Sequence, residues 1–269
     1  MNTTIVTAFV DIGRGDWEGF ANGDLIAPYI KRDNDTYFER FERLCKIKNP
    51  IICYTESKFF DKIKSIRDDV MLINIDELFV NHENVIKLIE NVQKNDEFID
   101  LLQSPASPEY WSAKYVAINF FKSFFVSHAY QEKLITTDNA AWIDFGYCRE
   151  KLFKDGYDWS FDCKDKINLF NIEQPDTTPI FSIVRSGKVY IQGCHIVAPA
   201  GQWIWLKELM TQAMNQLLGV GLIDDDQTML LMSYRMTPHL FKLNKVHPSN
   251  WFVIFDEKFN CTTFTQSAT

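Results

Sequence analysis

The chain has 269 residues, of which 46% are hydrophobic and 14% aromatic. A globular chain of this length buries roughly three quarters of the surface that its unfolded form exposes, so we expect one large domain or two closely joined halves. The formal net charge of −8 excludes a broad cationic surface for nucleic acid. A polyanionic ligand would therefore be held by a metal ion or by a few local cations.

The cysteines and the apolar stretches predict the setting in which the protein works. The six cysteines lie far apart and form no CxxC pair, and no basic and apolar leader opens the chain. These features predict a reducing, cytoplasmic setting without a zinc knuckle. The longest apolar stretch, residues 115–130, is interrupted by Asn119, Lys122 and His128. We therefore expect no segment that spans a bilayer, and at most a peripheral contact with the inner membrane.

The first half of the chain alternates between strand and helix patterns. Strands are expected over residues 3–12, 50–56, 70–75 and 140–145. Helices are expected over residues 36–47, 84–93 and 108–130, the last of which begins after Ser107-Pro108. Strands that alternate with helices are typical of a mainly parallel sheet.

The second half begins with residues 151–179, which are rich in Asp, Lys and turn residues, and which we interpret as a seam between two halves. Next come two predicted strands, 179–187 and 188–197, paired as a hairpin around Ser186-Gly187. Amphipathic helices are expected over 203–218 and 224–236, and a last strand over 247–256.

Asp144 ends the buried stretch AAWIDF and raises the first functional question. A carboxylate at this point is costly unless a cation, water or hydrogen-bond donors meet it. Because open α/β sheets bind ligands at the carboxyl ends of their strands, Asp144 could hold a cation or a ribose hydroxyl. A solvated turn aspartate before Gly146 explains the pattern equally well.

Arg14 and Lys114 are two cations that could meet phosphate. Arg14 lies between two glycines directly after the first predicted strand, where backbone amides and a guanidinium can bind an anion. The stretch lacks the third glycine of a dinucleotide fingerprint and the GK[ST] of a P-loop. Lys114 lies in an aromatic helix, where extension of its ammonium to solvent is the alternative to a phosphate contact.

Three adjacent aspartates, Asp224, Asp225 and Asp226, stand where a helix is expected to begin. Carboxylates there cap free amides, but mutual repulsion of three charges can also raise the pKa of one of them toward that of a general base. His195 and His247 each lie in a loop-like setting and are either ligands or structural histidines.

Five stretches, in this order, resemble the HtrL/YibB family of bacterial proteins. They are TAFVDIGRGDW at 7–17, WSAKYVAINFF at 111–121, WIDFGY at 142–147, VYIQGCHIVAPAGQW at 189–203 and DDDQTML at 224–230. The resemblance runs over nearly the whole chain. It implies an association with surface polysaccharide loci and a similarity to glycosyltransferases of the GT-A fold.

The resemblance also implies roles for single residues. It places a nucleotide-sugar donor at Thr7, Ala8, Asp11, Arg14, Lys114 and Asp144. It places the acceptor at Gln192, Gly193 and His195, and the catalytic base at Asp226, beside Gln227, with Asp225 as its alternative. A divalent metal ion, Mn²⁺ or Mg²⁺, would bind Asp144 and His247. Gly146 stands where such transferases have a second carboxylate, and this departs from a two-carboxylate metal site.

We therefore expect a GT-A-like α/β fold with a Rossmann-type, mainly parallel sheet between helices and a smaller C-terminal sheet on the acceptor side. Residues 1–269 would form one domain, with a nucleotide-sugar-binding half at 1–150 and an acceptor and catalytic half at 151–269. The expected function is transfer of a sugar, with inversion, from a UDP-sugar to a glycan in lipopolysaccharide, lipooligosaccharide or capsule synthesis. A non-catalytic nucleotide-sugar-binding or scaffold protein and a nucleotide-sugar hydrolase remain as alternatives.

Overall fold

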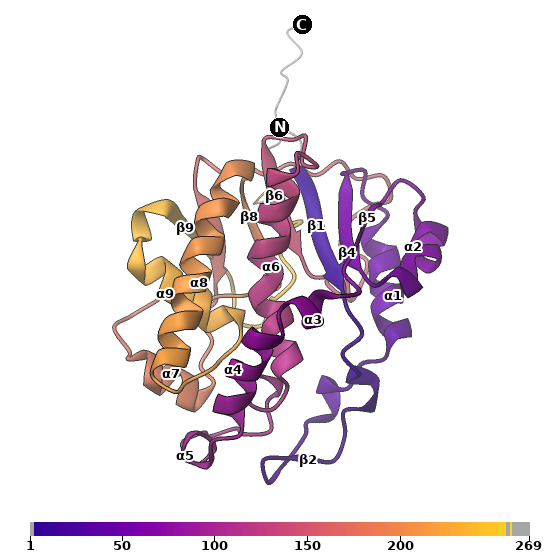
Figure 1. The fold of residues 1–269 in the computed structure, drawn as a ribbon. Helices are drawn as coiled ribbons and strands as arrows, with labels where there is room; N and C mark the ends of the chain where they lie inside the picture. Colours follow the sequence, from indigo (N-terminus) through magenta and orange to yellow (C-terminus); the bar gives the residue numbers. More distant parts are fainter. Residues whose placement is uncertain (1–2, 257–258, 260–269) are drawn as a thin grey trace, which may run out of the picture.

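A seven-stranded sheet forms the centre of the computed structural model, which describes residues 3–256 and 259 (Figure 1). The strand order is β5-β4-β1-β6-β8-β7-β9. The strands are β1 (Thr3–Phe9), β4 (Ile51–Thr55), β5 (Met71–Asn74), β6 (Asn139–Ile143), β7 (Ile167–Asn171), β8 (His195–Pro199) and β9 (Phe241–Lys245). Neighbouring strands are parallel except where β8 pairs with β6 and β7. The prediction of a mainly parallel sheet between helices is confirmed.

Helices cover both faces of this sheet, because successive strand side chains point to opposite sides. Ile5 packs into the core beneath α1 (Asn34–Leu44) and α2 (Phe60–Ile66), whereas its neighbour Val6 packs into the opposite core. The helices over that opposite core are α4 (Glu83–Gln93), α6 (Ala113–Gln131), α8 (Trp203–Gly219) and α9 (Asp226–Met236), which lie in front of the sheet in Figure 1. The remaining helices are short: α3 (Leu78–Asn81), α5 (Asp96–Ile99) and α7 (Ile180–Ser186).

The second half of the chain differs from the sequence prediction in three places. The first half of the expected hairpin is helix α7, which ends where Gly187 adopts a left-handed conformation with φ 62°. The interpreted seam contains the fully buried strand β7, and the last strand is β9 rather than 247–256. The strands of the C-terminal half, β7, β8 and β9, belong to the main sheet and form no separate sheet. The smaller sheet is instead the N-terminal pair β2 (Phe20–Ala21) and β3 (Asp24–Leu25).

The structure gives two further findings on the setting of the protein. Within residues 3–256 and 259, none of the helices combines the length and the apolar character needed to cross a membrane. In the same part of the chain, Cys45, Cys53, Cys148 and Cys194 form no disulfide bond. Cys261 lies outside the described residues.

Candidate active site

A cavity of about 740 Å³ opens at the carboxyl edge of β1 and β6. Its floor includes Ala8, Asp11 and Asp144, which follow or end these two strands. One wall is a face of α6, on which Tyr115, Ile118, Asn119 and Lys122 recur at helical spacing. The other walls are the first turn of α9, the segment 249–252, and the loops around residues 29–32, 107–109 and 193–194. The cavity therefore draws residues from both halves of the chain.

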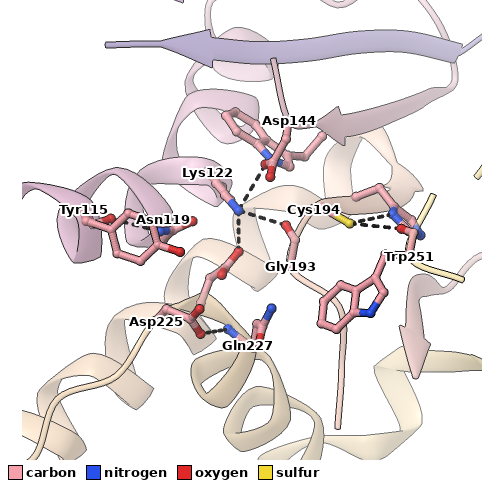
Figure 2. Close-up of polar contacts among 12 residues, drawn as sticks. Tyr115, Asn119, Lys122, Asp144, Gly193, Cys194, Asp225, Gln227 and Trp251 are labelled. Carbon is pink, nitrogen blue, oxygen red and sulfur yellow. Dashed lines mark hydrogen bonds and ion pairs between the residues drawn. The ribbon is translucent and has the colours of Figure 1, made fainter. Parts of the chain in front are cut away.

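Lys122 lies at the centre of the polar contacts in this cavity (Figure 2). Its Nζ donates to Asp226 Oδ2 at 2.7 Å and to the carbonyl oxygen of Gly193 at 3.0 Å, and it lies 3.1 Å from Asp144 Oδ1. The side chains of Lys122 and Asp226 are only 6% and 3% exposed, whereas that of Asp144 is 36% exposed. A buried ammonium thus joins one hidden carboxylate to one that faces the cavity.

The two aspartates keep Lys122 charged although almost no water reaches it. Burial opposes the charge, but Asp144 and Asp226 together raise the pKa of Lys122 above its ordinary value. Burial also raises the pKa of Asp226, and the nearby ammonium offsets only part of this effect. Trp142 Nε1 donates to Asp144 Oδ1 at 2.8 Å and orients that carboxylate at the end of β6.

The three adjacent aspartates divide into separate roles at the start of α9. Asp225 is the N-cap and accepts from the amide of Gln227 at 2.9 Å. Asp224 Oδ2 accepts from Thr228 Oγ1 at 2.7 Å, and Asp226 pairs with Lys122. Burial raises the pKa of Asp224 to about 6, and burial and then Asp226 raise the pKa of Asp225 well above its ordinary value.

Glu109 adds a fourth carboxylate to this end of the cavity, and the sequence analysis did not identify it. Burial, and then the charge of Asp224, raise the pKa of Glu109 to about 8. Tyr115 and Asn119 line the same region, and Asn119 Nδ2 donates to the carbonyl oxygen of Tyr115 at 3.0 Å. The first turn of α9 thus faces the cavity with carboxyl groups that hold protons more tightly than exposed ones do.

Gly193 makes room for the Asp226 carboxylate. A Cβ atom placed on Gly193 would lie 2.2 Å from Asp226 Oδ2, closer than non-bonded atoms approach. The absence of a side chain at this position therefore allows the carboxylate to reach Lys122. Of the three residues predicted on the acceptor side, Gly193 is the one that lines the cavity.

Gln192 and His195 lie behind the cavity wall, contrary to the prediction that they contact an acceptor. Gln192 is fully buried, and its Nε2 donates to the carbonyl oxygen of Asn250 at 3.1 Å. His195 is the first residue of β8 and packs against the rings of Tyr147 and Phe170. Burial lowers the pKa of His195 to about 3, so the ring is neutral.

The chain after β1 forms a tight loop beside the cavity. Asp11 accepts from Asn34 Nδ2 at 2.9 Å and from the amide of Gly13 at 3.0 Å, and the Asn34 bond helps to hold the pKa of Asp11 below its ordinary value. Ala8 and Asp11 line the cavity, whereas Thr7 is fully buried beneath them.

Arg14 also lines the cavity, but much of its hydrogen-bonding capacity is used within the protein. Its Nη1 donates to Tyr37 Oη at 2.8 Å and its Nη2 to the carbonyl oxygen of Ile30 at 2.9 Å. The guanidinium also lies 5.1 Å from the ring centre of Trp17. Arg14 therefore fastens the loop after β1 to α1 and to the segment around Ile30.

Lys114, for which a phosphate contact was predicted, is not among the residues that line the cavity. It is exposed, and its Nζ lies 5.2 Å from the ring centre of Phe79. A helix turns by about 100° per residue, which puts Lys114 off the face that carries Tyr115 and Lys122. The sequence signal for that face is a lysine and an asparagine three residues apart inside an otherwise apolar helix.

The residues present do not fit the predicted metal site. His247 is exposed, shares a 2.7 Å hydrogen bond with Ser249 Oγ, and is not among the residues that line the cavity. Asp144 has the ammonium of Lys122 beside it instead of a second ligand. Within the described residues, no three His, Cys, Asp or Glu side chains gather closely enough to hold a metal ion.

Gly146 occupies the position at which glycosyltransferases of this kind have a second carboxylate, and the structure leaves little room for a side chain there. A Cβ atom there would lie 2.9 Å from Cδ1 of Tyr37 on α1, so a side chain at 146 would displace that ring. The turn after β6 is therefore packed against α1 through a glycine. Carboxylate ligation from this position is excluded by the present packing.

Comparisons with known proteins identify relatives across the whole chain. The model of the HtrL_YibB family, described as a bacterial protein of unknown function, matches residues 1–260. Protein HtrL of Escherichia coli (strain K12) is 34% identical over 270 residues, which cover 94% of this chain and 91% of that protein.

Two solved structures align with most of this chain, with low TM-scores and low sequence identity. Mouse xyloside xylosyltransferase 1, in its apo form, has a TM-score of 0.43 and 10% identity over 91% of this chain and 85% of that chain. The glycosyltransferase GlyE of Streptococcus pneumoniae TIGR4 has a TM-score of 0.41 and 11% identity over 90% of this chain and 45% of that chain. Scores at this level do not decide what this chain does.

Proposed function

We propose that this chain, which belongs to the HtrL_YibB family, is a glycosyltransferase that moves a sugar from a nucleotide-diphosphate donor to a glycan acceptor. The observation that carries the proposal is the cavity at the carboxyl edge of β1 and β6, where cationic groups, buried carboxylates and aromatic walls meet. Open α/β sheets bind ligands at this edge. A volume of about 740 Å³ lies within the range of roughly 300 to 1,000 Å³ that is typical of ligand pockets.

The donor in this proposal is a UDP-sugar that lies across the ends of β1 and β6. Asp144 Oδ1 is engaged by Trp142 and Lys122, whereas Oδ2 has no hydrogen bond to any described residue. A ribose hydroxyl is a suitable donor to that free oxygen. Ala8 and Asp11 leave the end of β1 open for the base and the ribose.

The reaction needs a proton acceptor next to the acceptor hydroxyl. In the proposed step the acceptor oxygen bonds to the anomeric carbon, and the bond from that carbon to the β-phosphate oxygen breaks. The electron pair of the broken bond leaves with the nucleoside diphosphate, and the hydroxyl proton passes to Asp226, with Asp225 as the alternative. Carboxyl groups with raised pKa values suit this role. Attack from the side opposite the leaving group gives inversion.

The acceptor we propose is a glycan of lipopolysaccharide, lipooligosaccharide or capsule, reached at the inner membrane face. Tyr115, Trp251 and Phe252 line the cavity and offer aromatic surfaces on which sugar rings can stack. Tyr29 lines the cavity and is 76% exposed, and Phe20 and Leu25 of the β2–β3 pair are also exposed. These apolar side chains suit a lipid-linked acceptor.

Calorimetry with UDP and UDP-sugars tests the donor site directly. Asp144→Ala should weaken binding by tenfold or more, because the charged partner of the ribose and of Lys122 is lost. Asp138→Ala is the matched control, since this exposed residue precedes the opposite end of the same strand. Equal binding by both variants, or no binding of any nucleotide by the wild type, would refute the donor site.

Product analysis separates the proposed reaction from its alternatives. Incubation with UDP-sugars and a membrane glycolipid extract should yield an extended saccharide and free UDP. Free sugar and UDP without extension would identify a hydrolase. Binding without turnover on any offered acceptor would instead support a nucleotide-sugar-binding protein.

A further inference from the structure

Three arginines gather beside the cavity where α1 meets the turn after β6. Arg32 precedes α1, Arg40 lies on α1, and Arg149 follows β6. Arg32 and Arg149 line the cavity, and Cδ of Arg40 lies 3.7 Å from the position of a Cβ on Gly146. Arg43, one turn beyond Arg40, donates to the carbonyl oxygen of Cys148 at 3.3 Å and fastens the turn to α1. Arg149 lies more than 100 positions beyond the other three arginines in the sequence, so only the fold brings it into one cationic group with them.

This arginine group lacks the partners that such side chains normally have. Among the described residues, Arg32, Arg40 and Arg149 make no ion pair, and Nη1 of Arg40 is buried without a hydrogen-bond acceptor. Burial, and then the charges of Arg32 and Arg40, lower the pKa of Arg149. Arginines placed close together repel one another, and a bound anion would relieve that repulsion. A group of this kind beside a cavity therefore indicates an anion-binding site.

The nearby carboxylates do not neutralise the group. Glu39, on the same helix as Arg40, is paired with Arg43. Glu150 lines the cavity, but it is exposed and forms no ion pair with a described arginine. The Arg149 guanidinium lies 4.5 Å from the ring centre of Phe252, which leaves the edge of its planar fork available for an acceptor.

Among the residues that the structure describes, no three His, Cys, Asp or Glu side chains gather here closely enough to hold a divalent cation. Gly146 provides no carboxylate and has no room for one, and Asp144 already has the Lys122 ammonium beside it. The donor atoms that an anion finds here are guanidinium N–H groups. Planar guanidinium groups bind phosphate oxygens in pairs, and their charge does not depend on metal supply.

We propose that Arg32 and Arg149 bind the diphosphate of the nucleotide donor without a divalent metal ion, with Arg40 behind them adding positive charge. This inference rests on the proposed function and specifies how its donor site handles charge. As the bond to the sugar breaks, the electron pair goes to the leaving diphosphate, and the fixed guanidinium groups stabilise that developing charge. Lys122 stays paired with Asp144 and Asp226.

Calorimetric titration with UDP and UMP, in EDTA and again in Mn²⁺, tests the inference. Wild-type protein should bind UDP with the same Kd under both conditions and should prefer UDP to UMP. Arg32→Gln and Arg149→Gln should each raise the Kd for UDP in EDTA by on the order of tenfold or more, as loss of a charge-assisted hydrogen bond predicts. Their preference for UDP over UMP should shrink, and Arg149→Lys should recover part of it.

Arg185→Gln is the matched control, because Arg185 is exposed on α7 and does not line the cavity. Melting temperatures of all variants establish that each is folded, and both tested arginines lie at the surface or only partly buried. A wild-type protein that binds UDP in Mn²⁺ but not in EDTA overturns the inference and leaves the proposed function standing. UDP binding in EDTA that neither arginine variant weakens also overturns it. No nucleotide binding under either condition overturns the proposed function as well.

Discussion

Lys122 places a positive charge where almost no water reaches it, and two aspartates and one carbonyl group replace that water. The arrangement holds the end of β6, the loop before β8 and the start of α9 at one point. Because buried charges tolerate few alternative partners, small changes among these residues should have large effects.

The substitution Lys122→Met tests the strength of this junction. Methionine has a similar length but leaves the buried Asp226 without its cation. Removing one partner of a buried pair costs about 3 to 5 kcal/mol, so the free energy of unfolding from urea titration should fall by about that amount. The double variant Lys122→Met/Asp226→Asn should regain most of the stability, because no unpaired buried charge then remains. A loss below about 1 kcal/mol in the single variant would contradict a buried ion pair.

Gly193→Ala should displace the Asp226 carboxylate without changing any charge. The new methyl group would lie 2.2 Å from Asp226 Oδ2, and overpacking of this kind typically costs about 1 to 3 kcal/mol. We expect a lower melting temperature and at least tenfold slower sugar transfer. Gly219→Ala is the control, since a Cβ at this end of α8 meets no atom within 4 Å. Equal melting temperatures for the two variants would show that the site adapts to the methyl group.

Residues of the cavity that follow a strand could be predicted from the sequence. Residues of the cavity that lie on a helix could not be predicted as well. Asp144, Asp11 and Arg14 follow strands that were recognisable, and all three line the cavity. Lys114 and Lys122 lie on one helix, and only the direction of its buried face tells which of them enters the cavity. The arginine group was not predictable, because its members meet only after α1 packs against the turn beyond β6.

At the scale of elements, the first turn of α9 has two roles. It contains the cap of the helix, and it places a carboxylate in contact with Lys122. Its N-cap is Asp225, and the next residue, Asp226, points to Lys122. Adjacent helical residues differ by about 100° in direction, so one turn of helix can present one carboxylate to its own amides and another to the Lys122 ammonium.

Two matched asparagine variants separate these roles. Asp225→Asn keeps a capping oxygen and removes one charge from a crowded set, so stability should change by about 1 kcal/mol or less. Asp226→Asn keeps the size of the side chain but removes the charge that pairs with Lys122, so its melting temperature should fall. The amide also cannot take a proton, so sugar transfer by the folded variant should fall by on the order of a hundredfold or more while its UDP affinity stays nearly the same. Melting temperature, UDP affinity and transfer are measured for both. A collapse of transfer in Asp225→Asn alone would assign the base to the N-cap residue.

Elements were predictable where their hydrophobic period was long and regular. The amphipathic pattern of residues 203–218 gave α8 almost to its ends, and the alternation of strands and helices before residue 145 was recovered. Short apolar runs were ambiguous, because seven residues such as IFSIVRS fit a strand or two helical turns. Other elements form because they pair with strands that are distant in the sequence. β7 pairs with β9 and β8, and no local sequence pattern shows this pairing.

At the scale of the whole molecule, one continuous sheet brings both halves of the chain to a single cavity. The acidic side, with Glu109 and the start of α9, and the basic side, with Arg32 and Arg149, are contributed by segments that lie far apart in the sequence. The overall net charge of −8 therefore conceals a local separation of charge. The acidic side should also make stability depend on pH.

Glu109 provides the clearest test of that dependence. Its ordinary pKa is 4.5, and burial and Asp224 raise it to about 8 in the folded protein. Between these values the unfolded chain releases the proton and the folded chain keeps it, so a rise in pH lowers the free energy of the unfolded state relative to the folded state. Stability from this group is therefore complete below pH 4.5, falls through the window up to about 8, and is constant above it.

Glu109→Gln removes this titration while keeping the size of the side chain. Thermal unfolding at pH 5 and pH 8 should show similar melting temperatures for variant and wild type at the lower pH, and a higher melting temperature for the variant at pH 8. Asp224, whose pKa is raised to about 6, acts in the same direction at lower pH and remains in both proteins. Glu208→Gln, on the exposed surface of α8, is the control and should keep the same difference from wild type at both pH values. A variant that follows the wild-type curve across this range would mean that Glu109 is already ionised in the folded protein and that water reaches the acidic side of the cavity.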